Sequence, residues 1–327
     1  MKKTAAFFII IFTIFLAIFL YLDFFIGKGV SFPLSVKKGE STSIILKKLQ
    51  QEKIVKSILL DKITIRIMQL NNIKAGKYYF QNTDSLYDIF KKINSGKVYM
   101  ETITIPEGFN IYDISKLLKK KGITNIDNFI SLALNRDFTR SLNIKGDRVE
   151  GFLFPDTYKF AKGIKAETVI KEMVNNFWRH LPDKFITRAK KIGWPLYKIV
   201  ILASIIEKET SVSQERRLIS AVFHNRLKKK MKLQTDPTII YGLLPNFNGN
   251  ITRKNLTDRY NPWNTYTHYD LPPTPISNPG TEAIKAALYP ERVNYLYFVS
   301  KNNGTHYFSS TFKEHNKAVY KYQIKRK

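Results

Sequence analysis

The sequence predicts an α+β protein in three parts: one N-terminal transmembrane helix, a membrane-proximal α/β region, and a second domain of mixed helices and strands. Three observations predict this class. They are an apolar run near the N-terminus, two strand–turn–helix segments that echo each other, and helical periodicity that starts near Ala166 and gives way to turn-rich sequence after Lys230. The 327 residues are typical of about two domains. We expect a cytoplasmic tail at 1–4, the transmembrane helix at 5–26, the membrane-proximal region at 27–160 and the second domain at 161–327.

The N-terminal run AAFFIIIFTIFLAIFLYLDFFI, residues 5–26, contains a single charge, Asp23. At about 1.5 Å per residue it spans roughly 33 Å as a helix, enough for a bilayer core of about 30 Å. Lys2 and Lys3 precede the run and favour a cytoplasmic N-terminus. A cleaved signal peptide is the alternative, but the run is long for one and no A-x-A-like site follows it. We therefore expect a single-pass protein of the cytoplasmic (inner) membrane, with its remainder on the outer, periplasmic or wall, side.

Charge and composition exclude several classes of protein. Lys and Arg number 54 against 26 Asp and Glu, which gives a net charge of +28. Such a chain expects polyanionic surroundings, and outside the cell these are an acidic wall polymer or lipid headgroups, not nucleic acid. The absence of cysteine excludes a disulfide scaffold, a thiolate metal site and a cysteine nucleophile. No nucleotide-binding fingerprint occurs, and the histidines lack metal-ligand spacing, so we expect neither cofactor nor metal; the histidines are His180, His224, His268, His306 and His315.

The two echoing segments are Ser35–Val55 and Thr104–Ile123, each a short strand, a glycine turn and an amphipathic helix. Gly39 corresponds to Gly108, and three apolar positions also correspond: Ile45 with Ile114, Leu49 with Leu118, and Ile54 with Ile123. Ser41 and Asn110 are the expected N-caps. A weaker third copy covers 78–97. Coincidence is one interpretation, because any strand–turn–helix unit has this pattern; the other is that the region resembles LysM-type glycan-binding modules, which are βααβ folds.

One segment carries the expected chemistry, ILASIIEKETS, Ile201–Ser211. Its apolar residues leave no polar face, so the helix should be buried on most sides, yet it ends in Glu207, Lys208 and Glu209. A carboxyl at the rim of an apolar pocket has a raised pKa and can serve as a general acid. The alternative is that the charges are the solvated end of the helix. Residues two apart point to different faces, so spacing alone does not choose between Glu207 and Glu209.

Five ordered motifs in the second half of the chain resemble those of the MltG/YceG-like family of endolytic murein transglycosylases. They are ASIIEKET, ERRLISAVFHNRLKKKMKLQTDPTIIYG, NPWNTYTHYDLPP, PISNPGTEAIKAALYP and YLYFVSKNNGTHYFSSTFKEHNKAV. The resemblance extends to the N-terminal anchor, the IPEG turn and GFLFPDTY. The family pattern near LPPTPI is GLPPGPI, so Asp270 and Thr274 depart from it and put the local loop geometry in doubt.

The resemblance implies a lytic transglycosylase, a carbon–oxygen lyase that cleaves the MurNAc–GlcNAc β-1,4 bond of peptidoglycan and leaves a 1,6-anhydro-MurNAc end. A single glutamate of the E-K-E-T motif would be the acid and then the base. We assign it to Glu209, because IIEKET then aligns with the I-x-R-Q-E-S helix end of lysozyme-like transglycosylases; Glu207 is the second choice. The resemblance also suggests a terminator of glycan elongation and contacts with synthases of the elongation machinery.

Six residues of these motifs are candidates for substrate binding, because sugars need planar hydrogen-bonding groups and aromatic faces: Gln234, Thr235, Asp236, Tyr241, Asn264 and Tyr266. The alternative is that Asp236 caps a turn and that the aromatic residues are core. His306 and His315 are expected to be structural hydrogen-bonding residues, and Glu215 is expected on an exposed face. A non-catalytic LysM-type anchor that binds peptidoglycan is the competing function.

Overall fold

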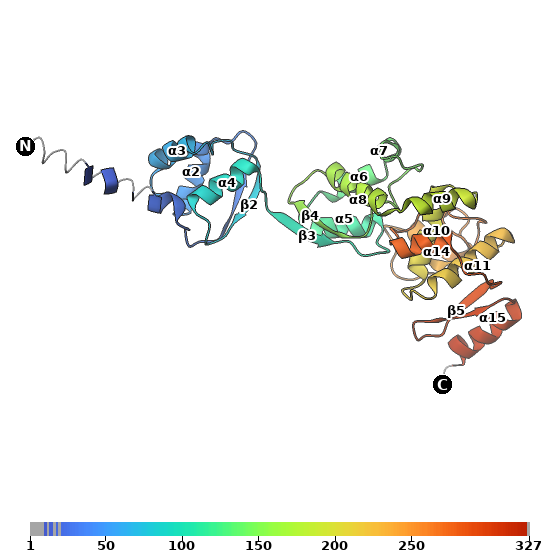
Figure 1. Ribbon diagram of the computed structural model, residues 1–327. Helices are drawn as coiled ribbons and strands as arrows, with labels where there is room; N and C mark the ends of the chain where they lie inside the picture. Colours follow the sequence, from blue (N-terminus) through green and yellow to red (C-terminus); the bar gives the residue numbers. More distant parts are fainter. Residues whose placement is uncertain (1–9, 12, 16–17, 19–20, 326–327) are drawn as a thin grey trace, which may run out of the picture. The chain divides into compact units, whose positions relative to one another are not determined.

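A computed structural model describes residues 10–11, 13–15, 18 and 21–325 and divides the chain into two compact units, Met1–Glu101 and Thr102–Lys327 (Figure 1). The boundary expected from the sequence, between residues 160 and 161, lies inside the second unit. Segments on both sides of that position share one apolar core, which includes Phe152 and Phe177. The mixed α+β class is confirmed, and the sheets of the described residues have two strands each.

The first unit contains β1 (Phe32–Val36), α2 (Thr42–Gln51), α3 (Ile58–Ile67), β2 (Gly76–Phe80) and α4 (Leu86–Ser95). Its two strands pair antiparallel, with Phe32 opposite Phe80. Alternate residues of β1 are buried, and α2 and α4 supply fully buried side chains such as Leu49 and Phe90. The order is therefore strand, helix, helix, strand, followed by one more helix.

The echo between the two segments extends to backbone geometry. Gly39 and Gly108 both adopt left-handed conformations, with φ of 86° and 77°. The corresponding leucines, Leu49 and Leu118, are fully buried, and each carbonyl accepts a bond from the N–H five residues later. Of the two expected N-caps, Asn110 accepts bonds from two backbone N–H groups, whereas the Ser41 side chain accepts none. The correspondence read from the sequence is thus structural.

Of the expected transmembrane helix at 5–26, residues 5–9, 12, 16–17 and 19–20 lie outside the described residues. Among the residues described, no helix has the length and apolarity needed to cross a bilayer.

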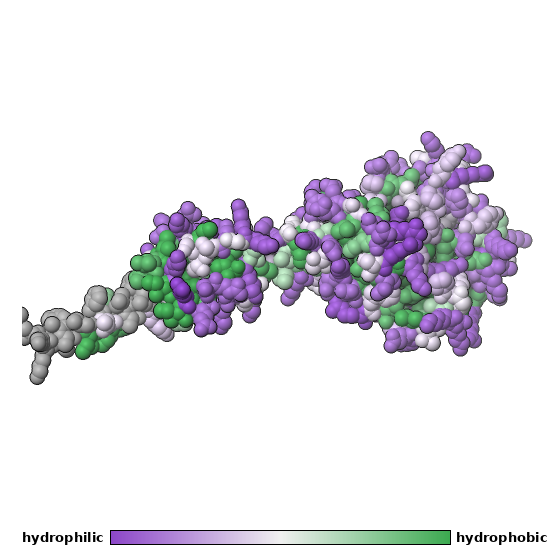
Figure 2. All heavy atoms as spheres, turned by 90° about the horizontal axis from the view of Figure 1, so that it is seen from above, coloured by the Kyte–Doolittle hydropathy of each residue, from purple (hydrophilic) through white to green (hydrophobic). Residues whose placement is uncertain are grey.

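The second unit is larger, and Figure 2 shows hydrophilic side chains over most of the face that it presents. Its strands form two pairs, β3 with β4 and the antiparallel hairpin β5–β6. The elements up to the buried helix are β3 (Met100–Thr104), α5 (Ile111–Lys120), α6 (Ile126–Ala133), α7 (Arg136–Ser141), β4 (Thr157–Ala161), α8 (Ala166–His180), α9 (Asp183–Lys191) and α10 (Leu196–Glu209). The remaining elements are α11 (Arg216–Lys228), α12 (Asp236–Gly242), α13 (Arg253–Thr257), α14 (Thr281–Leu288), β5 (Tyr297–Ser300), β6 (His306–Ser309), α15 (Phe312–Val319) and the π-helix η1 (Tyr320–Ile324).

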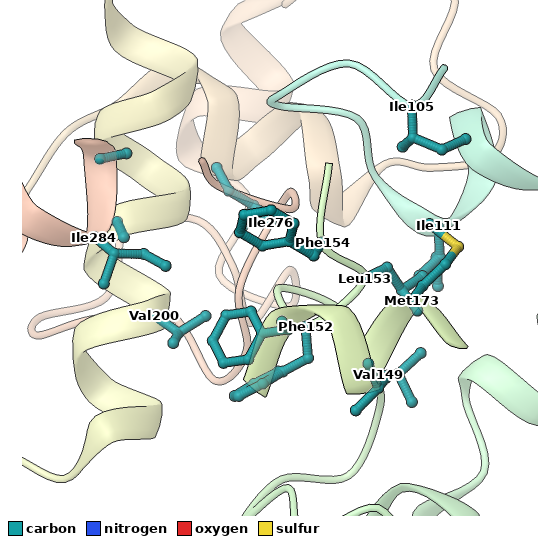
Figure 3. Packing of buried hydrophobic residues seen from close by; sticks show 14 of the residues in the cluster. Ile105, Ile111, Val149, Phe152, Leu153, Phe154, Met173, Val200, Ile276 and Ile284 are labelled. Atoms are coloured by element: carbon teal, nitrogen blue, oxygen red, sulfur yellow. The ribbon is translucent and has the colours of Figure 1, made fainter. Parts of the chain in front are cut away.

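Helix α10 is the centre of this unit. All residues from 199 to 206 are buried, as the apolar run predicts, because α14, α11 and α12 pack around it. Figure 3 shows Val200 of α10 and Ile284 of α14 within the same cluster as Phe152. A helix packed on all sides is held rigidly, so its last residue has a fixed position.

Two local expectations are wrong, and two elements of the structure were not expected. The S-x-x-Q pattern of Ser211 and Gln214 predicts a capping box, but none forms there, because residues 211–215 are a loop and α11 starts at Arg216. The turn-rich sequence after Lys230 also favours a strand within Leu233–Gly242, but this segment contains helix α12, which starts at an Asp-Pro pair suited to a first helical turn. Strand β6 and helix α15 were not expected from the sequence.

Candidate active site

Glu209 is the last residue of α10 and lines a cavity of about 490 Å³. The other walls come from α11, α12, the β5–β6 hairpin and α15. At Thr210 the backbone leaves the helix in an extended conformation. The buried helix thus ends at the wall of a cavity, and the side-chain carboxyl of its last residue is available to a ligand there.

The surroundings of Glu209 favour its protonated form. Burial raises the pKa of this carboxyl, and the negative charge of Asp236 acts in the same direction. The Thr235 hydroxyl donates a hydrogen bond to Oε1, and this bond opposes the increase in pKa. The net direction is upward, as a proton donor near neutral pH requires.

Glu207 has fixed protein partners instead. Its Oε1 accepts a bond from Nη2 of Arg216 at 3.2 Å, and its Oε2 accepts one from the N–H of Gly280 at 3.0 Å. The side chain is 5% exposed and is absent from the walls of the cavity. Burial raises the pKa of Glu207 too, but Arg216 lies against it, so this carboxylate links α10 to α11 and to the start of α14.

Four of the six expected binding residues lie together in the cavity wall. Gln234, Thr235 and Asp236 are consecutive there, and Tyr266 donates its hydroxyl to Asp236 at 2.7 Å. Gln234 has a φ of 52°, a conformation that is uncommon for a residue with a side chain and that occurs at functional sites. Its N–H donates to the carbonyl of Thr265 at 3.1 Å, which holds the segment in place.

Arg226 holds the same wall in place through hydrogen bonds. It is 8% exposed, and its guanidinium donates to the carbonyls of Leu296 and Leu233 at 2.7 and 2.9 Å and to Oε1 of Gln234 at 3.2 Å. Among the residues described, no carboxylate pairs with it. On the sequence alone Arg226 could equally brace its own helix, because bonds to carbonyls 7 and 70 residues away leave no local pattern.

The other two expected binding residues are away from the cavity. Tyr241 is 5% exposed, donates its hydroxyl to Glu150 at 3.0 Å and packs edge-on against Trp263. Asn264 is fully buried, and its amide donates to three backbone carbonyls, the nearest that of Asp258 at 2.7 Å. Tyr241 has the core role that the sequence left as an alternative for the aromatic residues, and Asn264 is buried as well.

Two features of the cavity were not read from the sequence. Helix α15 and η1 contribute His315, Val319 and Gln323, spaced by four residues, to one wall. Glu215, expected to be exposed, is 8% exposed and pairs with His306. The histidine that pairs with it lies 91 residues later, a contact that local spacing does not show.

A larger cavity, of about 820 Å³, lies between the start of α10 and the end of α11, beside Trp194 and Tyr269. Its one carboxylate is Asp270, whose side chain is 65% exposed. Size alone would select this cavity, but the cavity at Glu209 contains a carboxyl whose pKa is raised by burial, so it is the better candidate for acid catalysis.

The sequence profile of the YceG-like family matches residues 34–321. The chain belongs to this family. It is 34% identical over 307 residues to a Bacillus subtilis protein named endolytic murein transglycosylase, covering 88% of this chain and 84% of that one. A protein of the same name from Streptococcus pneumoniae is 27% identical over 315 residues, but the chain spans only 57% of its length.

A crystal structure of a YceG-like protein from Listeria monocytogenes has a similar fold. The TM-score is 0.61 at 32% sequence identity, and the match covers 88% of this chain and 98% of that one. The family membership predicted from the motifs is therefore confirmed.

The departures of this YceG-like chain from the family pattern are accommodated locally. Asp270 adopts a φ of 68°, the left-handed conformation that glycine favours, and its carboxylate accepts the N–H of Leu271 at 2.8 Å. Aspartate tolerates this conformation because such local bonds compensate for the strain. Thr274 is 6% exposed and accepts a bond from the Trp263 indole at 3.0 Å.

Proposed function

We propose that this chain is an endolytic murein transglycosylase in which Glu209 is the catalytic acid and base. The observation that carries the proposal is a carboxyl with a raised pKa at the wall of a 490 Å³ cavity, supported by Thr235. The names of the relatives agree with this activity. The substrate is the glycan of peptidoglycan, and the bond cleaved is MurNAc–GlcNAc β-1,4.

The proposed reaction uses one carboxyl twice. Protonated Glu209 gives its proton to the glycosidic oxygen as the bond to C1 of MurNAc breaks. The C6 hydroxyl of the same MurNAc attacks C1 and closes a 1,6-anhydro ring. Its proton passes to the Glu209 carboxylate, which is thereby restored to the acid form. Because the nucleophile belongs to the substrate, the second carboxylate that ordinary glycosidases need has no role.

Asp236 supports a second candidate, hydrolysis. It lines the same cavity, and a pair of carboxylates is the arrangement with which glycosidases activate water or form a covalent intermediate. In this chain the Tyr266 hydroxyl already donates a hydrogen bond to the Asp236 carboxylate, which favours a positioning role for Asp236. The two reactions differ in their products, because the anhydro end is lighter than the hydrolysed end by one water molecule.

The deciding experiment is mass spectrometry of products released from purified glycan strands by the full chain in detergent. Wild type should produce anhydro ends, and Glu209→Gln should lower their rate of formation by at least about a hundredfold while the fold persists. Glu207→Gln is the matched control, two residues away on the same helix, and should keep the activity. Hydrolysed ends from wild type would contradict the lyase reaction. Full activity of Glu209→Gln would contradict the residue assignment.

We also propose that residues 5–26 anchor the chain in the cytoplasmic membrane, with the N-terminus inside and the cavity outside. The apolar run supports this orientation, as does a positive charge that suits an acidic wall. Since the chain has no cysteine, Lys184→Cys on the exposed face of α9 gives a single label site. A membrane-impermeant maleimide should label it in intact cells. Labelling only after lysis would place the second unit inside the cell.

The strand–helix–helix–strand order of the first unit supports a LysM-like glycan-binding role for it. An enzyme that holds strands near the membrane and cuts within them would end their elongation, and elongation synthases would be its neighbours. Loss of such a terminator should lengthen the glycan strands of the wall. A binding anchor without catalysis would sediment with the wall and leave the mass spectrum of the glycan unchanged.

A further inference from the structure

Glu215 and His306 form a buried pair that the proposed reaction does not use. Glu215 immediately precedes α11, and His306 begins β6. One carboxylate oxygen, Oε2, lies 2.7 Å from Nδ1 of the imidazole, and the other, Oε1, accepts the backbone N–H of His306 at 2.9 Å. The side chains are 11% and 14% exposed. Both carboxylate oxygens are therefore committed to one residue, whose ring they hold in one orientation.

This geometry determines which ring nitrogen carries a proton. An ionised carboxylate can only accept hydrogen bonds, so Nδ1 of His306 is the donor. In a neutral imidazole the second nitrogen, Nε2, then presents a lone pair. None of the described residues hydrogen-bonds Nε2, and it is not among their buried unpartnered atoms. The pair thus delivers a hydrogen-bond acceptor with a defined orientation.

That acceptor belongs to the cavity of Glu209. His306 lines this cavity together with Glu209, and its ring packs in a T-shaped arrangement with Phe298, with the ring centroids 5.4 Å apart, which restricts rotation. In the starting state of the proposed reaction, Glu209 still holds its proton, and its Oε1 is bonded to Thr235. The acid is therefore poorly placed to orient the attacking C6 hydroxyl before the bond breaks, and a separate acceptor is needed.

We propose that His306 accepts, through Nε2, a hydrogen bond from the C6 hydroxyl of the saccharide bound beside Glu209, and that Glu215 is the positioning residue that fixes the imidazole. This inference rests on the proposed function. No proton is transferred to His306: the hydroxyl keeps its proton until Glu209 has become a carboxylate and takes it. The histidine aligns the nucleophile with C1, and Glu209 carries out both proton transfers.

A purely structural role would also explain the pair, since it ties the β5–β6 hairpin to the start of α11. Two variants of His306 separate the roles. In His306→Asn the side-chain amide can occupy the place of Nδ1 and keep the bond to Glu215, but nothing replaces Nε2. In His306→Gln the longer side chain can place its amide oxygen near the position of Nε2, while the bond to Glu215 is lost.

The test measures kcat and KM for formation of anhydro ends, with thermal unfolding of each full-length variant. We expect His306→Asn to unfold at the temperature of wild type and to lose at least about tenfold in kcat with little change in KM. His306→Gln should recover part of this loss although it unfolds at a lower temperature. Glu215→Gln, which can accept only one of the two N–H groups, should lower kcat by an intermediate factor.

The results that overturn the inference are distinct from those that overturn the proposed function. If wild type forms anhydro ends and the kcat of His306→Asn is within about threefold of the wild-type kcat, Nε2 has no role. Nε2 also has no role if His306→Gln is less active than His306→Asn, because activity then depends on the hydrogen bond to Glu215, which only His306→Asn keeps. A wild-type chain that forms no anhydro ends overturns the proposed function, and this inference with it.

Discussion

The buried Glu150 predicts a specific dependence of stability on pH. This carboxyl is fully buried and accepts three bonds, from the N–H of Ile111 at 3.1 Å, the Tyr241 hydroxyl at 3.0 Å and the Asn278 amide at 2.9 Å. Burial outweighs these bonds and raises the pKa of Glu150 from 4.5 to about 7. The perturbation to make is Glu150→Gln, which removes the titration and keeps the shape of the side chain.

The sign and size follow from linkage. Between the two pKa values the unfolded chain has already lost the proton that the folded chain retains, so the free energy of unfolding falls as pH rises. A shift from 4.5 to about 7 corresponds to about 3.4 kcal/mol in full. Between pH 5 and pH 8 Glu150 should lower the free energy of unfolding by about 2.5 kcal/mol of this total. The rest is outside this range, because the unfolded carboxyl is already partly ionised at pH 5 and the folded one is nearly fully ionised at pH 8.

Urea titrations at pH 5 and pH 8 measure this difference. The three tryptophans, Trp178, Trp194 and Trp263, all belong to the second unit, so fluorescence of the full chain reports the unfolding of the unit that contains Glu150. Wild type should lose about 2.5 kcal/mol more than Glu150→Gln between the two pH values. Glu172→Gln, at an exposed carboxyl, should behave as wild type. A difference below about 1 kcal/mol between wild type and Glu150→Gln would refute the argument.

Two further predictions concern the backbone at Gly151 and the carboxyl of Glu209. Gly151→Ala should lower the free energy of unfolding by about 3 kcal/mol or more, measured by the same urea titration, because Gly151 has a φ of 88° and an added Cβ would lie 2.6 Å from Pro275. The rate of anhydro-end formation should fall about tenfold per pH unit above the raised pKa of Glu209, because only the protonated acid starts the reaction; a rate that increases steadily with pH would contradict this role.

The local parts of the fold could be predicted from the sequence. The periodicity of Ser35–Val55 and Thr104–Ile123 gave two strand–turn–helix units with matching left-handed glycines, and the apolar run of Ile201–Ser211 gave a buried helix that ends in charge. These features depend on neighbours within a few residues, where spacing determines which side chains share a face. The start of α12 at Asp236 was missed because local β-branched residues resemble a strand.

Contacts between distant segments could not be predicted in this way. Spacing showed that Glu207 and Glu209 face different sides of α10, but not which side would be closed by protein. Arg216 and the N–H of Gly280 hydrogen-bond to Glu207 and close its side of the helix, whereas residues 234–236 form the cavity wall near Glu209. Burial of Glu215 likewise depends on a histidine 91 residues later.

Glu150 and Glu209 show how one fold can tune two buried carboxyls differently. Glu150 lies at the N-terminus of α5, where the helix dipole and three donors favour its charged form against burial. Glu209 is the last residue of α10, where the dipole disfavours negative charge, its side chain has one donor, and Asp236 adds a second negative charge. Burial raises the pKa at both sites, and so does a neighbouring carboxylate, Asp113 for Glu150 and Asp236 for Glu209, but only at Glu209 does the helix end act in the same direction. Placing a carboxyl at the C-terminal end of a buried helix therefore favours its protonated form, which is the form that the proposed intramolecular attack by a sugar hydroxyl requires of Glu209.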